Sequence, residues 1–307
     1  ERAVDALLAE KVEAIAVCLL NSFANPVHEA MLKEIIERKA PRLPKSLSFE
    51  VLPEIKEYER TSTTVINAYV MPIVATYLRA LRKGLDAGGI PARLLLMQSN
   101  GGLTTDGAAA ERPMNIIESG PAGGVVGAQA LARAKDLDKI ITFDRGGTTA
   151  KASMVEHGEV ARAHEYAVGA GIMIGSRLLS GAGYTLKVPA IDLAEVGAGG
   201  GSVIWIDAAG SMRVGPVSAG ASPGPVCYDQ GGTEPTITDA NVVLGYINPR
   251  YLVGGELALN SAKAHKSIEA IARRVGMTPE HAAHGAHQIA AANMIRAIKS
   301  VSTERGR

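Results

Sequence analysis

Residues 139–149 read KIITFDRGGTT, and this stretch decides how the rest of the chain is interpreted. An apolar run of strand length leads into Asp144, which two glycines and two threonines follow before a new strand-like run begins. Glycines let the backbone turn so that successive N–H groups face one anion, and threonine hydroxyls add further donors. The stretch therefore predicts a strand–loop–strand phosphate site formed by Gly146, Gly147, Thr148 and Thr149.

The acidic residue of this stretch has a separate predicted role. Asp144, at the end of the strand, can hold Mg²⁺ directly or through water, or can orient an attacking nucleophile. The spacing fits neither a Walker A loop nor a Rossmann fingerprint, since a strand rather than a helix follows the glycines. Turn statistics leave an ordinary Asp-Gly hairpin as an equal alternative for these residue types.

Three further segments are rich in glycine or proline. Residues 118–128 (ESGPAGGVVGA) place a glycine turn before a helix, where either anion binding or close helix packing is possible. Residues 196–202 (VGAGGGS) predict a close approach of backbone to ligand at Gly199 and Gly200, with a mobile loop as the alternative. Residues 216–225 (PVSAGASPGP) have little apolar surface, which is typical of a structural crossing or an active-site cover.

The order of apolar runs predicts an α/β fold. Strand-like runs at 12–20, 93–97 and 139–143 alternate with helical periodicity at 27–39, 62–85 and 122–134. A further strand is expected over 46–52, and Pro72 is expected to interrupt the helix over 62–85. Helical segments between buried strands are typical of mixed α/β sheets.

The second half of the chain changes character after Asp144. Residues 150–155 and 159–164 are expected to form strands adjacent to 139–143, and residues 203–207 and 211–214 a second hairpin. An irregular loop is expected over 215–235, and helices are expected at the following ranges: 238–245, 261–275 and 279–303. We therefore expect one α/β region over 1–135 and a second region, with the phosphate loop and the Gly/Pro-rich cover, over 136–307.

Composition excludes several partners. The chain has 32 Lys and Arg against 31 Asp and Glu, so no basic stripe indicates nucleic acid and no polybasic cluster indicates a membrane surface. The longest apolar run, residues 14–20, is too short to span a bilayer. Cys18 and Cys227 are far apart among apolar or turn residues, which indicates free thiols in a reducing compartment and a cytoplasmic protein.

Several long motifs resemble the hydantoinase A/oxoprolinase family, whose relatives include N-methylhydantoinase, 5-oxoprolinase and the acetone and acetophenone carboxylase subunits. The resemblance covers nearly all 307 residues in one order. The matching motifs are VCLLNSFANP (17–26), EYERTSTT (57–64), MQSNGG (97–102), SGPAGG (119–124), DRGGTT (144–149), VGAGGGS (196–202), GPVCY (224–228) and PTITDAN (235–241).

The resemblance implies an actin-like ATPase fold, related to ribonuclease H, that is incomplete at both ends of this chain. Such proteins bind nucleotide between two related halves, with one Asp-Gly-Gly-Thr hairpin from each half and a later glycine-rich adenosine segment. Residues 144–149 match the second phosphate loop, so the first loop is expected before Glu1 and the adenosine segment after Arg307. Arg145 and Ser222 depart from the apolar residue and the Asp expected there, and the sequence leaves the role of Arg145 open.

The resemblance also implies a function. ATP with Mg²⁺ would phosphorylate the carbonyl oxygen of a cyclic amide of the hydantoin or 5-oxoproline type, and water would then open the ring. A ketone carboxylase subunit is the alternative reaction, and a non-catalytic actin-like nucleotide-binding module is the alternative of another class. A hydantoinase B-like second subunit or domain is the implied partner.

Weaker signals favour ordinary structure. His281, His284 and His287 are spaced by three on an expected helix, where a solvated helix start is favoured over a metal site. Glu57, Glu59 and Arg60 are interpreted mainly as a local charge cluster, with a place near the substrate cleft as the alternative.

Overall fold

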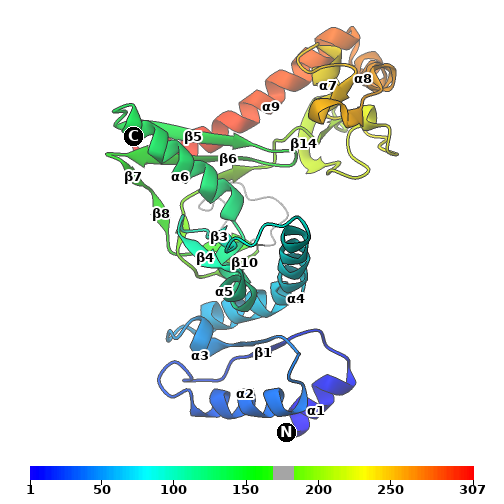
Figure 1. The fold of residues 1–307 in the computed structure, drawn as a ribbon. Coiled ribbons are helices and arrows are strands. Elements are labelled where there is room, and N and C mark those ends of the chain that lie inside the picture. The colour runs from blue at the N-terminus through cyan, green and yellow to red at the C-terminus, as the bar shows by residue number, and fades with distance from the viewer. Residues whose placement is uncertain (169–182) are drawn as a thin grey trace. The chain divides into compact units, whose positions relative to one another are not determined.

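The computed structural model describes residues 1–168 and 183–307, which divide into two compact units (Figure 1). Unit 1 holds Glu1–Asp136 with the described parts of Glu159–Ala170 and Ala182–Asp192. Unit 2 contains Leu137–Gly158 and Leu193–Arg307. The phosphate-loop stretch and the Gly199 segment both belong to unit 2.

Unit 1 combines helices with two-stranded sheets. Its helices are α1 (Arg2–Ala9), α2 (Val27–Lys39), α3 (Ser48–Val51), α4 (Glu57–Ala87), α5 (Asp106–Glu111), the 3-10 turn η1 (Pro113–Ile116) and α6 (Ser119–Ala134). Its strands are β1 (Ile15–Val17), β2 (Lys45–Leu47), β3 (Leu95–Met97), β4 (Leu103–Thr105), β7 (Glu159–Val160), β8 (Arg162–Ala163), β9 (Tyr166–Val168), β10 (Tyr184–Leu186) and β11 (Ala190–Ile191). β1 and β2 pair in parallel, whereas β3–β4, β8–β11 and β9–β10 pair antiparallel.

The parallel pair β1–β2 follows from the apolar runs around it. A parallel pair needs a crossover, and α2 supplies it. Ile15, Val17, Ile36 and Leu47 are buried together in one core with Val4 of α1. The strand expected over 12–20 is therefore present, although β1 is shorter than the apolar run.

The strand expected over 46–52 is wrong in its second half, because β2 ends at Leu47 and α3 begins at Ser48. Ser48 Oγ donates to Glu29 Oε1 (2.6 Å), and the Phe49 N–H donates to Glu29 Oε2 (3.1 Å). Glu29 is fully buried in α2 and also accepts the Leu19 N–H. The Glu29 carboxylate therefore accepts hydrogen bonds from the first turn of α3, and the strand ends before this turn.

The expected interruption of α4 at Pro72 is also wrong, since α4 continues through it. Packing on both sides offsets the missing backbone donor of proline, because Asn67 and Ala68 before it and Leu78 after it are buried. By length and composition α4 could also cross a membrane, but a single helix of this kind is weak evidence for a span. Its buried face includes Arg60 and Asn67, whose side chains bind backbone carbonyls of unit 1.

Unit 2 is built on an antiparallel sheet in the order β12 (Ala194–Val196), β6 (Ala150–Glu156), β5 (Lys139–Arg145). The remaining elements are the hairpin β13 (Ser202–Ile206) and β14 (Met212–Ser218), η2 (Val226–Tyr228), α7 (Ile237–Val243), β15 (Tyr251–Leu252), η3 (Val253–Gly255), β16 (Leu257–Ala258), α8 (Ser261–Val275), α9 (Pro279–Val301) and η4 (Thr303–Arg305). The expected strands at 139–143, 150–155, 203–207 and 211–214 are confirmed. The third strand expected beside them, over 159–164, is split into β7 and β8 of unit 1, where β8 pairs with β11.

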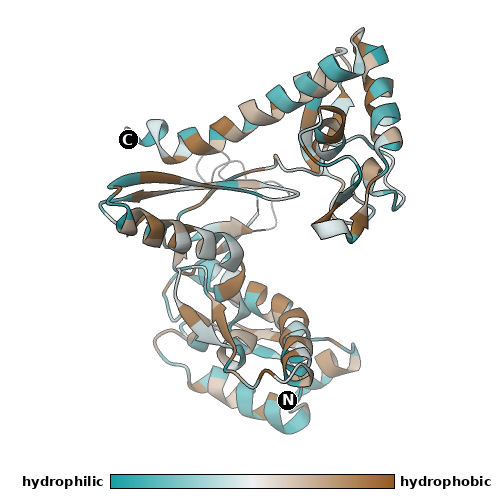
Figure 2. Ribbon diagram, turned by 45° about the horizontal axis from the view of Figure 1, so that its top comes forward, coloured by the Kyte–Doolittle hydropathy of each residue, from teal (hydrophilic) through white to brown (hydrophobic). Residues whose placement is uncertain are grey.

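The helix α9 covers one face of the β12–β6–β5 sheet. Ala150, Ala152, Ala194 and Val196 form a buried cluster with Ala297 and Val301 of α9. Figure 2 shows hydrophilic and hydrophobic residues mixed along this helix, as expected when only one side of it packs. Since side chains alternate across a strand, Lys151 and Glu195 lie on the other face.

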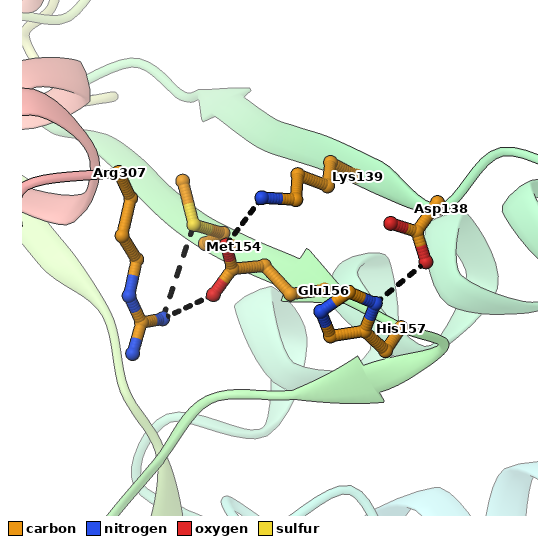
Figure 3. A network of polar contacts seen from close by, with 6 residues as sticks. All are labelled: Asp138, Lys139, Met154, Glu156, His157 and Arg307. Atoms are coloured by element: carbon orange, nitrogen blue, oxygen red, sulfur yellow. Dashed lines mark hydrogen bonds and ion pairs between the residues drawn. The ribbon is translucent and has the colours of Figure 1, made fainter.

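The end of the β5–β6 hairpin remote from Asp144 is fastened by charged groups (Figure 3). Arg307 Nη1 lies 2.7 Å from Glu156 Oε2, and Lys139 Nζ lies 3.6 Å from Glu156 Oε1. His157 Nδ1 lies 2.8 Å from Asp138 Oδ1. These contacts tie the end of the chain to β6.

Candidate functional site

The predicted phosphate loop is a tight connection between β5 and β6. The Gly146 N–H donates to the Thr149 carbonyl (2.9 Å), which closes the turn. Gly147 and Thr148 at its tip are exposed, Thr149 is half-buried, and Asp144 is exposed near the end of β5. The loop therefore has the strand–loop–strand form that the sequence predicted.

A second glycine segment docks against this loop through backbone. The Gly200 N–H donates to the Gly146 carbonyl (3.2 Å), and the Gly201 N–H donates to the Gly147 carbonyl (2.6 Å). A Cβ at Gly199 would lie 2.3 Å from the Gly147 oxygen and 2.4 Å from its carbonyl carbon. Only glycine fits this approach, so the structure places Gly199 and Gly200 against the loop, whereas the sequence predicted a close approach to a ligand at these positions.

This docking leaves hydrogen-bond donors at the loop. The carbonyls of Gly146 and Gly147 are occupied by the glycine segment, whereas the N–H groups of Gly147, Thr148 and Thr149 donate to no residue that the structure describes. Successive free backbone N–H groups in a turn form a site that favours anions. The loop therefore fits phosphate on the evidence of its own hydrogen bonds.

The Pro/Gly-rich segment reaches the loop where β14 ends. Ser218 Oγ donates to Thr148 Oγ1 (3.4 Å), and the Gly220 N–H donates to Ser218 Oγ (3.1 Å). The Ala219 N–H donates to the Gly201 carbonyl (2.9 Å). Ser218 was not predicted as a site residue, and its place in a Pro/Gly-rich segment was the only signal for it.

The first turn of α7 fixes the docked glycine segment from its other side. The Thr238 N–H and its hydroxyl both donate to the Gly200 carbonyl (2.8 and 2.9 Å). Thr236 and Asp239 form a capping box at the start of α7. Asp239 is fully buried and also accepts the N–H groups of Val226 and Cys227 (3.2 and 2.7 Å). The PTITDAN motif therefore holds the glycine segment in place.

Three charged residues lie in a row across the sheet beside the loop. Strand register places Asp144 opposite Lys151 and Lys151 opposite Glu195, so these side chains share one face. Lys151 Nζ lies 3.7 Å from Glu195 Oε1, and both side chains are only 14% exposed. Lys151 follows Asp144 by seven residues, and only the pairing of the strands shows that they are neighbours.

The structure also limits how a cation and Arg145 can take part. In the described ranges, 1–168 and 183–307, no group of three or more His, Cys, Asp or Glu could hold a metal. A single carboxylate such as Asp144 still fits Mg²⁺, which commonly uses one or two carboxylates together with substrate phosphates. Arg145 pairs with Ala150, so it lies on the opposite sheet face from Asp144.

Other motifs from the sequence lie elsewhere. Gly120, Gly123 and Gly124 lie in α6 of unit 1, and Glu57 and Glu59 form the first turn of α4. The three histidines do not converge: His281 and His284 are exposed, whereas His287 Nδ1 lies 3.3 Å from Asn241 Oδ1.

Comparisons with known proteins identify relatives of the whole chain. The family model described as "Hydantoinase/oxoprolinase" matches residues 60–307, and the model of its N-terminal region matches residues 1–40. An uncharacterised protein of Methanocaldococcus jannaschii is 44% identical over 96% of this chain and 43% of its own length. The caprolactamase subunit alpha of Pseudomonas jessenii is 37% identical over 99% of this chain and 42% of its own length.

Solved structures give the same result. Nucleotide-free acetone carboxylase, from a study of ATP-dependent acetone carboxylation, matches with a TM-score of 0.82 at 28% identity, over 99% of this chain and 42% of that one. The ATP-dependent caprolactamase of Pseudomonas jessenii matches with a TM-score of 0.69 at 36% identity, over 100% of this chain and 42% of that one. The predicted α/β, actin-like ATPase fold is thereby confirmed. The chain spans less than half the length of these relatives.

Proposed function

Because this chain belongs to the hydantoinase/oxoprolinase family, a family of ATP-dependent amidohydrolases and carboxylases, we propose that its whole protein hydrolyses a cyclic amide at the expense of ATP. The substrate class we propose is a lactam or cyclic imide of the hydantoin or 5-oxoproline type. The observation that carries the proposal is the loop whose Gly147, Thr148 and Thr149 N–H groups have no partner in the described residues. The Gly199–Gly201 backbone packs against this loop and binds its carbonyls instead. The relatives named above support ATP as the cosubstrate.

The residues of this chain would act mainly by binding and positioning. ATP supplies the phosphoryl group that makes the amide carbonyl open to attack by water. The amides of Gly147, Thr148 and Thr149, with the Thr148 hydroxyl, bind phosphate oxygens and offset their negative charge. Asp144 holds Mg²⁺ directly or through water.

Lys151 and Glu195 support this arrangement. Lys151 lies between two carboxylates on one sheet face, so its ammonium group offsets the charge of Asp144 and Glu195 together. Lys151 and Glu195 are only 14% exposed, which limits the screening of their ion pair, whereas Asp144 is exposed.

A ketone carboxylase subunit is the second candidate, and the 0.82 TM-score with acetone carboxylase favours it equally. Both reactions require the same phosphate loop, so the loop does not separate them. The substrate does: stimulation of ATP turnover by hydantoin, 5-oxoproline or caprolactam supports the amidohydrolase, whereas stimulation by a ketone with bicarbonate supports the carboxylase. The name caprolactamase subunit alpha also motivates a second, hydantoinase B-like subunit or domain as partner.

The test of the loop is Asp144→Ala in the whole protein. We expect a loss of ATP turnover of about 100-fold or more, with unchanged melting temperature, because Asp144 is exposed and its role is electrostatic. Glu256→Ala is the matched control, since Glu256 is an exposed carboxylate of the same unit that lies outside the loop and its sheet. Equal turnover in Asp144→Ala and wild type would refute the assignment. Turnover that no cyclic amide or ketone stimulates would favour the non-catalytic module.

A further inference from the structure

Unit 1 contains a polar pocket of about 420 Å³ that has no part in the proposed function. It lies where residues of α2, β2, α3, α4 and α5 meet. Its volume falls within the range of about 300–1,000 Å³ that is usual for sites that bind small molecules. Asn67 of α4 lines it and is buried, with its amide nitrogen 3.2 Å from both Ser46 Oγ and the Glu111 carbonyl. These bonds hold the Asn67 side chain in place in the wall of the pocket.

The walls carry more basic than acidic groups. Two lysines are already neutralised: Lys33 Nζ lies 2.7 Å from Glu50 Oε1, and Lys45 Nζ lies 3.1 Å from Glu37 Oε1. Glu50, with Glu37 and Glu111 nearby, also raises the pKa of Lys33. Both lysines are therefore paired with acidic groups of the same pocket.

Two arginines and one carboxylate, Glu111, remain, so the groups outside these pairs carry a net positive charge. Arg42 follows α2 and Arg112 follows α5, so they enter the pocket from separate elements. Neither guanidinium has an ion-pair or hydrogen-bond partner among the residues of 1–168 and 183–307. A guanidinium presents a planar fork of donors that matches the two oxygens of a carboxylate or a phosphate. Two such forks on one rigid pocket form a complement to a small oxyanion.

We infer that this pocket binds a small anion carrying carboxylate or phosphate groups, and that Arg42 and Arg112 donate hydrogen bonds to it. The site is independent of the phosphate loop, because every residue that lines it belongs to unit 1. The two lysine–glutamate pairs contribute no net charge, so Arg42 and Arg112 determine the preference of the pocket for an anion. A ligand there would link α5 to the α2–β2 connection.

The test measures binding of two probes, inorganic phosphate and glutarate, to the whole protein by calorimetry. Gly199→Ala serves as the background, because a Cβ 2.3 Å from the Gly147 oxygen displaces the loop whose amides would otherwise bind phosphate. Arg42→Gln and Arg112→Gln should each weaken binding by about 10-fold or more, and the double variant should abolish it. Arg112→Lys should restore part of the affinity, because it keeps the charge and loses the fork.

Arg93→Gln is the matched control, since Arg93 is an exposed arginine of unit 1 that does not line the pocket. Both variants of the pocket change exposed side chains, so unchanged melting temperatures are expected. Binding of phosphate alone identifies a phosphate-bearing ligand, and binding of glutarate alone identifies a carboxylate. Failure of both probes to bind at millimolar concentration overturns the inference. Equal weakening by Arg93→Gln also overturns it, because it would show diffuse attraction by surface charge.

Discussion

Gly199→Ala tests directly whether the docked glycine segment shapes the phosphate loop. The new Cβ would lie 2.3 Å from the Gly147 oxygen, 2.4 Å from its carbonyl carbon and 2.6 Å from the Thr148 nitrogen. All three atoms are backbone, so no side chain can rotate to relieve the contact. Because comfortable contacts lie near 3.5 Å, the two segments must separate by about 1 Å.

This separation has a cost that can be estimated. Overpacking of a well-packed site costs about 1–3 kcal/mol. Loss of the hydrogen bonds from Gly200 and Gly201 to the loop carbonyls adds about 0.5–1.5 kcal/mol each. We therefore expect the free energy of unfolding to fall by about 2–6 kcal/mol if all of these contributions apply. Each kcal/mol should lower the melting temperature by about 2–4 °C.

The rate of ATP turnover should also fall in Gly199→Ala, even where the variant remains folded. A displacement of about 1 Å in a positioning group costs about 100-fold in rate, because the donors no longer match the phosphate oxygens. The assay is steady-state ATP turnover at a temperature where circular dichroism shows the variant to be folded.

Gly127→Ala is the control for Gly199→Ala. Gly127 lies inside α6, and a Cβ there meets nothing within 4 Å. It should therefore keep its turnover and gain up to about 1 kcal/mol from helix propensity. Wild-type turnover and melting temperature in Gly199→Ala would show that the close approach does not shape the loop.

Three other predictions follow from buried groups and from the extent of the chain. Asp239→Ala should destabilise unit 2 by about 3 kcal/mol or more in urea unfolding, because four hydrogen-bond donors lose their carboxylate acceptor. Asp239→Asn keeps one acceptor oxygen and should destabilise it less. Equal stability of the wild type and both variants would contradict this prediction. Burial and the Asp239 carboxylate raise the pKa of the Cys227 thiol, so stability should fall as pH rises above about 8.5, the pKa of an unfolded thiol, and this fall should be smaller in Cys227→Ala. Residues 1–307 by themselves should bind ATP more weakly than micromolar in calorimetry, because only one phosphate loop is identifiable in the sequence; micromolar binding would contradict the two-loop argument.

Local patterns in the sequence were enough to predict the elements that carry the site. The apolar run 139–143 ends in Asp144 and glycines, so a strand and a tight turn were expected, and β5, the loop and β6 follow that order. The hairpin β13–β14 was also expected, over 203–207 and 211–214. Such signals lie within a few residues of what they predict.

Interactions between distant residues account for the errors. The strand expected over 46–52 becomes helix α3 because Glu29, about twenty residues earlier, accepts its first donors. Pro72 remains inside α4 because side chains on both sides of it are buried. The row formed by Asp144, Lys151 and Glu195 depends on the register of three strands, which no single stretch of sequence specifies.

The glycine run at 197–201 shows what such a pattern can predict. The run predicted a close approach of backbone to a ligand, with a mobile loop as the alternative. The structure shows a different neighbour, because Gly199 and Gly201 both approach the backbone of Gly147. We therefore propose that Gly199 and Gly200 are positioning residues that contact the loop carbonyls, and that phosphate binds at the amides of Gly147, Thr148 and Thr149. A glycine run thus predicts that another group will lie close to its backbone, but only the fold shows which group that is.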